Sequence, residues 1–104
     1  MFVARIVTVP AAGAAEDLSF PNAGMADELD YTFDFGPWLG PLDRVANAAV
    51  VPDAAMTLGT IRADAGRVIA RIGPASAAGT YVIGCAVITS QNRIKSVSAA
   101  VTLQ

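Results

Sequence analysis

The chain has 104 residues, the length of one domain, and a net charge of −2. Apolar residues make up 54% of it, many of them alanine, and only 15% are charged, against roughly 25% in average soluble domains. The acidic balance and the lack of a basic run interleaved with aromatic residues argue against nucleic-acid binding, and no apolar run is long enough to span a membrane.

The chain begins with a β-branched stretch, FVARIVTV, which predicts a strand over residues 2–9 that ends at Pro10. Residues 11–29 are small and acidic, with interspersed glycine and proline, and they predict a long loop or arm. We therefore divide the chain into an N-terminal strand and extended arm over residues 1–29 and a sandwich domain over residues 30–104.

Aromatic and polar residues alternate in the next stretch, DYTFDF, which predicts a strand of the core. Successive side chains of a strand point to opposite faces, so the three rings share one face and the polar residues share the other. We expect Tyr31, Phe33 and Phe35 to face inward, and Asp30, Thr32 and Asp34 to face solvent or a partner.

A turn is predicted over GPWLGPLD because of its glycine and proline content. Trp38 lies there out of register with the three alternating rings, and two interpretations remain open for it. The indole either caps the end of the sandwich or, together with Leu39, anchors a partner, since tryptophan is enriched among interface hot spots.

Three short strands are predicted in the middle of the chain, in RVANAAVV, MTLGTIRA and RVIARIG, with the linkers PDAA and DAG between them. In the last of them, alternation places Arg67 and Arg71 outward and three apolar residues inward, namely Val68, Ala70 and Ile72.

Two longer strands, TYVIGCAVITS and IKSVSAAVTL, complete the chain, and the linker QNR between them predicts a hairpin. On the final strand we expect one apolar face, made by Val97, Ala99, Val101 and Leu103, and a polar side marked by Lys95, Ser96 and Ser98. About seven short strands with evenly spaced turn signals are typical of an all-β fold, an immunoglobulin-like antiparallel β-sandwich with an N-terminal extension.

Residues suited to catalysis are scarce. The chain has no histidine and a single cysteine, Cys85, so that an intrachain disulfide and an ordinary zinc site are both ruled out. Cys85 lies in an apolar strand, where we expect a small buried hydrophobe. We predict that the protein is not an enzyme and that it has no catalytic residues, no metal and no cofactor.

The charges divide unevenly along the chain. Residues 1–64 carry all nine acidic residues and three arginines, whereas residues 65–104 carry four basic residues and no acidic one. Such a division suits docking of one copy on another, with association that weakens as salt is added. The alternative is that the charges are scattered over solvated strands.

From residue 30 to the end, the chain resembles the fiber–tail adaptor family of tailed bacteriophages. The resemblance is carried by LDYTFDFGPWLG, MTLGTIRADAGRVIARI and GPASAAGTYVIGCAVITSQNRIKSVSAAVTL. It implies a virion structural protein of the tail or neck, made in the cytoplasm of the host bacterium. The implied partners are further copies of the chain, the tail tube or adaptor, and the fiber. As partner-binding residues we predict Trp38, Leu39, Asp30, Asp34, Arg93 and Lys95.

Two other functions are compatible with a small β-sandwich that lacks catalytic residues. The first is a capsid decoration or cement protein, which would be present in many more copies per particle. The second is a carbohydrate-binding module in which Trp38 and Tyr31 stack on sugar rings.

Overall fold

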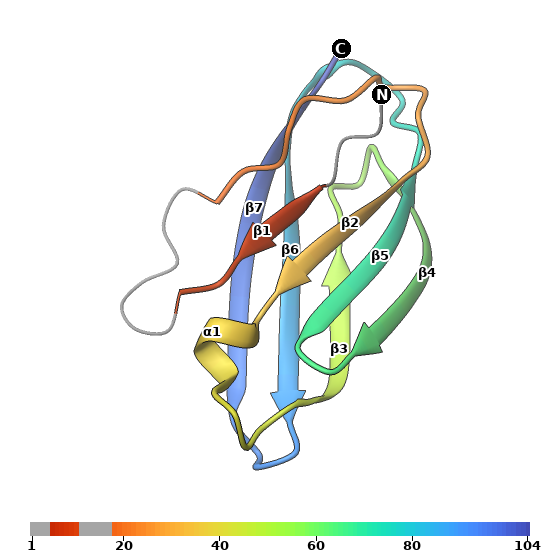
Figure 1. The fold of residues 1–104 in the computed structure, drawn as a ribbon. Coiled ribbons are helices and arrows are strands. Elements are labelled where there is room, and N and C mark those ends of the chain that lie inside the picture. Colours follow the sequence, from red (N-terminus) through yellow and green to blue (C-terminus); the bar gives the residue numbers. More distant parts are fainter. Residues whose placement is uncertain (1–4, 11–17) are drawn as a thin grey trace.

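The computed structural model describes residues 5–10 and 18–104, and within these residues two β-sheets pack face to face (Figure 1). The order of strands in the four-stranded sheet is β1 (Ile6–Thr8), β2 (Leu29–Asp34), β5 (Arg67–Gly73) and β4 (Thr57–Asp64). The order in the three-stranded sheet is β3 (Val45–Val51), β6 (Gly79–Thr89) and β7 (Ile94–Leu103). The predicted all-β sandwich is confirmed.

The core lies between the sheets, and the aromatic alternation of β2 builds its centre. Tyr31, Phe33 and Phe35 expose 2%, 0% and 0% of their surface, as predicted. The ring of Phe20 packs edge-on against Tyr31 and Phe33, with ring centroids 5.0 and 5.4 Å apart. Thr32 was expected to be exposed, but it is buried, because the register places it between residues of β1 and β5 on the outer side of the sheet.

The strands β5 and β7 follow most of the predicted alternation. Arg67 points outward, and the three inward residues of β5 are fully buried. β6 and β7 form an antiparallel hairpin with a continuous register, and the predicted inward face of β7 is buried. The prediction for Lys95 is wrong: the residue is half-buried and lies on the same face as Val97, not with Ser96 and Ser98 on the outer side.

The N-terminal region lies against both sheets where the structure describes it. β1 pairs in parallel with β2, while residues 18–25 run beside the end of β7 through backbone hydrogen bonds. Phe20 N donates to Ala100 O at 2.8 Å, and Gln104 N donates to Ala23 O at 2.9 Å. Residues 2–4 of the predicted strand and 11–17 of the predicted arm lie outside the described residues.

The segment predicted as a turn contains one turn of helix, α1 (Gly36–Leu39). Pro37 suits the first turn of a helix, where its missing N–H leaves no hydrogen bond unmade. Gly40 ends the turn with φ at +78°, a left-handed conformation that favours glycine. Four residues are too few to give helical periodicity, which is why the sequence predicts only a turn.

Candidate partner-binding surfaces

The residues predicted to bind a partner do not gather at one site. Trp38, Leu39 and Arg93 come together at the end of the sandwich where α1 meets the β6–β7 hairpin (Figure 1). Asp30 and Asp34 lie on β2, on the four-stranded sheet. The surface therefore has three distinct parts: this end of the sandwich and the outer faces of the two sheets.

The Arg93 guanidinium organises the end of the sandwich. It donates to the carbonyl oxygens of Leu39 and Trp38 at 3.0 and 3.1 Å, and to Asp43 Oδ2 at 3.3 Å. It also lies over the indole ring of Trp38, 4.2 Å from the ring centroid, a favourable cation–π geometry. These four residues, which we call the Arg93 clamp, tie α1 to the hairpin across more than fifty residues of sequence.

Asp43 is the residue of the clamp that sequence reasoning missed. Its side chain is 2% exposed, and its Oδ1 accepts hydrogen bonds from Ser90 Oγ at 2.8 Å and Arg44 N at 2.9 Å. Burial by itself raises the pKa of this carboxyl, but hydrogen bonds from the Thr89 and Ser90 side chains and from the Arg44 and Gln91 backbones outweigh burial and lower the pKa to about 2. Asp43 is therefore charged at neutral pH.

Trp38 packs against its own chain. Its ring meets Phe35 at a centroid distance of 6.3 Å and an interplanar angle of 70°, while the Arg93 guanidinium covers one face. The indole is half-buried, so that it caps the sandwich and still presents part of its surface. Leu42, four residues further along the chain, is 85% exposed, and its carbonyl oxygen accepts a hydrogen bond from Gln91 Nε2 at 3.1 Å.

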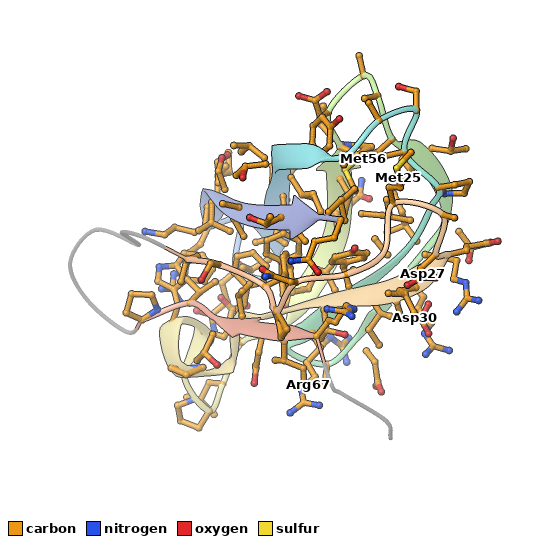
Figure 2. The ribbon with its side chains drawn as sticks, turned by 90° about the horizontal axis from the view of Figure 1, so that it is seen from above. Met25, Asp27, Asp30, Met56 and Arg67 are labelled. Atoms are coloured by element: carbon orange, nitrogen blue, oxygen red, sulfur yellow. The ribbon has the colours of Figure 1, made fainter. Side chains whose placement is uncertain are left out.

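The outer face of the four-stranded sheet is charged, and the charges of β2 and β5 pair within the chain. Arg67 Nε lies 3.6 Å from Asp34 Oδ2. Arg71 forms two ion pairs, with Nε 3.4 Å from Glu28 Oε1 and Nη1 3.6 Å from Asp30 Oδ1. Figure 2 shows Asp30 and Arg67 pointing away from the sandwich on this side. The antiparallel pairing of β2 with β5 thus brings the acidic and basic parts of the sequence together inside one molecule.

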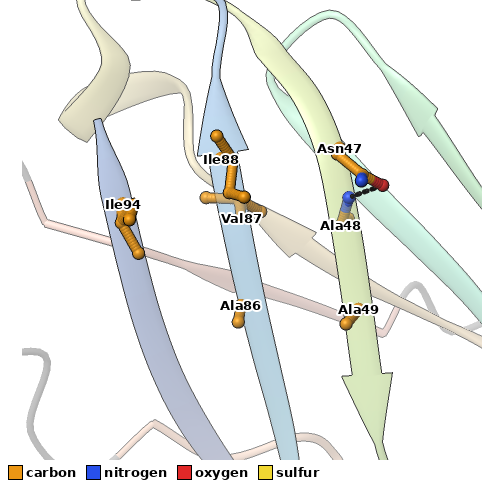
Figure 3. A pocket seen from close by; sticks show the side chains of 7 residues that line it. All are labelled: Asn47, Ala48, Ala49, Ala86, Val87, Ile88 and Ile94. Atoms are coloured by element: carbon orange, nitrogen blue, oxygen red, sulfur yellow. Dashed lines mark hydrogen bonds between the residues drawn. The ribbon is translucent and has the colours of Figure 1, made fainter. Parts of the chain in front are cut away.

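The outer face of the three-stranded sheet is different, because within the described residues it carries no charged side chain. We call it the uncharged face, and its outward residues are Asn47, Ala49, Val51, Val82, Gly84, Ala86, Ile88, Ile94, Ser96 and Ser98. Two shallow hollows of about 220 and 190 Å³ lie along it and share the side chains of Ala49 and Ala86. Figure 3 shows Ile88 beside Ile94 at one end, with Ala86 and Ala49 next along.

Cys85 behaves as predicted, as a buried hydrophobe. It is 2% exposed, and burial raises the pKa of its thiol to about 12, so that it stays protonated at neutral pH. In residues 5–10 and 18–104, no three acidic, cysteine or histidine side chains come together to hold a metal ion. The described part of the chain also has no helix that is long and apolar enough to cross a membrane.

The chain is similar to a known protein family and to solved structures. Residues 24–102 match the model of a family described as podophage GP4 fiber-tail adaptor protein gp77. Among solved structures, the chain is similar to the cysteine protease inhibitor EhICP2 from Entamoeba histolytica, with a TM-score of 0.53 and 13% identity over 96% of this chain and 94% of that one. At such low identity the second likeness supports the fold alone. No curated protein sequence matches the chain.

Proposed function

Because this chain belongs to the podophage GP4 fiber-tail adaptor family, we propose that it joins tail components to fibers in the virion of a bacteriophage. The family match carries the proposal, since it spans the sandwich from the segment before β2 almost to the end of β7. It confirms the resemblance predicted from the sequence. The family is one of phage structural proteins, which is not an enzyme class.

We also propose that the sandwich is of the immunoglobulin-like type with about seven strands. The orders β1-β2-β5-β4 and β3-β6-β7 correspond to the ABED and CFG sheets of that fold, with the strands lettered in chain order. One feature is unlike it: β1 runs parallel to β2 rather than antiparallel.

The end of the sandwich is the proposed contact for another virion protein, tail or fiber. In this proposal Leu42 and the exposed part of Trp38 make up an apolar tip, whose backbone carbonyls are tied to the hairpin by hydrogen bonds from Gln91 and Arg93. An aromatic and aliphatic tip is the kind of group that fills a pocket on a partner at a hot spot. Asp30, Asp34 and Lys95 remain predicted contacts.

Imaging of purified particles by cryo-electron microscopy tests the proposed function. We expect the protein in a ring at the tail, in on the order of a dozen copies per particle, as cyclic assemblies have. A location spread over the capsid lattice, with hundreds of copies by quantitative mass spectrometry, would contradict the proposal and favour a decoration protein.

A carbohydrate-binding function is less well supported by the side chains named for it. Tyr31 is 2% exposed beneath Phe20, and one face of the Trp38 ring is covered by Arg93. Neither ring presents the open face that stacking on a sugar requires. Binding to a broad glycan array that is lost in Trp38→Ala would revive this function.

A further inference from the structure

We propose that the uncharged face binds the same face of a second copy of this chain, so that two three-stranded sheets pack face to face. Four large apolar side chains lie exposed there, with 44% of Ile88, 72% of Ile94, 69% of Val51 and 53% of Val82 accessible. The inference rests on the proposed function in one respect: it assumes that several copies of the chain are present together in the particle.

Gly84, at the middle of this face, leaves space over β6 for a side chain of another molecule. It lies in the central strand β6, opposite Val51 and Ser98, in a stretch of regular register. A Cβ added at this glycine would meet Val51 O at 3.7 Å and Ser98 Oγ at 4.0 Å, which are ordinary contacts. Glycine weakens the interior of a strand, so one that internal packing does not require commonly marks a site where another chain comes close.

A glycine of the other sheet gives the contrast. A Cβ at Gly59 of β4 would come within 3.0 Å of Arg71 O, a contact too tight to be accommodated without movement of the backbone. Gly59 is therefore explained by packing inside the chain. Packing inside the chain does not require Gly84, and contact with another molecule is the explanation that we propose for it.

The raised and hollow parts of the uncharged face are arranged so that two copies of it can fit together. The row that contains Ile88 and Ile94 stands on one side of Ala86, and the row that contains Gly84 lies on the other side. A twofold axis beside Ala86 would seat Ile88 of each copy over Gly84 of its partner, within the hollow beside Ser98. This is the isologous contact that a symmetric dimer requires.

Charge also favours a second copy on this face. Because the face carries no charge in the described residues, two copies bring no like charges together when they meet there. On the opposite side of the molecule, the carboxylates of Glu28 and Asp30 already pair with Arg71 in the same chain.

The strand edges are less suited to association than the face. On β3, Ala48 N–H donates to Asn47 Oδ1 at 2.9 Å (Figure 3), and Val45 N–H donates to Ala65 O at 3.0 Å. The register of β4 is interrupted between Leu58 and Ile61, an irregularity of the kind that blunts an edge. Pairing of another strand along β3 or β4 is thereby hindered.

The size of the face predicts a weak dimer. Three strands about 14 Å wide in all and about 27 Å long give a flat area of about 400 Å² per copy, or about 800 Å² for the pair. This is smaller than the roughly 1,200–2,000 Å² of stable interfaces and in the range of transient ones, so we expect a weak pair with a dissociation constant on the order of 10–100 µM. In a particle, other contacts of each copy would raise the local concentration and strengthen the pair.

Sedimentation equilibrium of the full chain, from about 5 µM to about 1 mM, tests the proposal across this range. The wild type should pass from monomer to dimer. Ala86→Glu should raise the dissociation constant about tenfold or more, because the two introduced carboxylates face each other beside the axis. Ala54→Glu, the same change at an exposed loop position, should leave the constant unchanged.

A mixing experiment identifies the occupant. An equimolar mixture of Ala86→Glu and Ala86→Lys should associate about tenfold more tightly than either variant alone, since opposite charges then meet across the axis. If either variant melts early, Ser98→Glu and Ser98→Lys on β7 take their place. A wild type that stays monomeric at about 1 mM, or a mixture that gains nothing, would overturn the proposal, and a different virion protein would then be the better occupant. Because the measurement uses purified protein, its failure leaves the location of the chain in the particle as a separate question.

Discussion

The two outer faces of this sandwich differ in how far their side chains find partners within the same chain. The face of the four-stranded sheet carries opposite charges that pair with one another, as Arg71 does with Glu28 and Asp30. The face of the three-stranded sheet carries exposed isoleucine and valine, with a glycine that internal packing does not require. The charges of β2 and β5 are paired within the monomer, whereas the second face leaves apolar surface open to another molecule.

The ion pairs on the charged face give a new interpretation of the uneven charge distribution along the sequence. The acidic and basic parts of the chain suggested docking between copies, but β2 and β5 are adjacent antiparallel strands and their charges meet inside one copy. Exposed ion pairs of this kind contribute little, about 0–1 kcal/mol each. The surface with most to gain from association is the one that shows no charge signal.

The largest expected effect separates apolar residues that build the fold from those that do not. Phe33→Ala should lower the free energy of unfolding by about 3–5 kcal/mol, because the ring is fully buried between the sheets. Val82→Ala, on the uncharged face, should change it by less than about 0.5 kcal/mol. Urea denaturation followed by circular dichroism measures both. A large loss in Val82→Ala would show that this face is part of the core.

The two glycines give the second test. Gly59→Ala should lower the free energy of unfolding by about 1 kcal/mol, since the added Cβ is 3.0 Å from a backbone oxygen. Gly84→Val should leave the monomer as stable or more stable by up to about 1 kcal/mol, because valine favours strands, while it weakens the dimer. Thermal melts and sedimentation on the same samples separate the two outcomes. Destabilised Gly84→Val monomers would contradict our account of this position.

The Arg93 clamp gives a pH-dependent test at the end that joins the two sheets. The pKa of Asp43 lies at about 2 in the folded chain, below its usual 3.8. The carboxylate therefore contributes its full stability above about pH 4 and loses that contribution as the pH falls toward 2. Melting temperatures of the wild type and of Asp43→Asn should converge over this window. Parallel curves would show that Asp43 is not a stabilising charge.

Most of the fold could be predicted because most strands bury one face; β4, which is exposed at every position, is the exception. In β2, β5 and β7 the sequence therefore shows apolar residues at alternate positions, which is the pattern of a half-buried strand. Lys95 was misplaced because it stands at the start of its strand, where one inward position reaches the end of the sandwich and tolerates a charged group. The single turn of α1 was missed because it is too short for a periodic signal.

The candidate surfaces were harder to predict, because they depend on which strands become neighbours. Nothing near Asp43 in the sequence indicates a partner fifty residues away, and Arg93 was singled out without its contacts. The uncharged face comes from alternate residues of three strands, each of which is unremarkable alone. Pairing and register create both surfaces, and a single sequence does not determine either.

The smallest expected effect concerns the charged face and decides between the two accounts of association. Asp30→Asn removes one partner of Arg71, and it should change the free energy of unfolding by less than about 0.5 kcal/mol. It should leave the dimer unchanged. The dissociation constant of the wild type should likewise hold steady from about 50 mM to about 500 mM sodium chloride, because screening acts on charges and the uncharged face has none to screen. A dimer that dissociates as salt rises, and that Asp30→Asn weakens, would instead place the contact on the charged face, as the uneven charge of the sequence suggests.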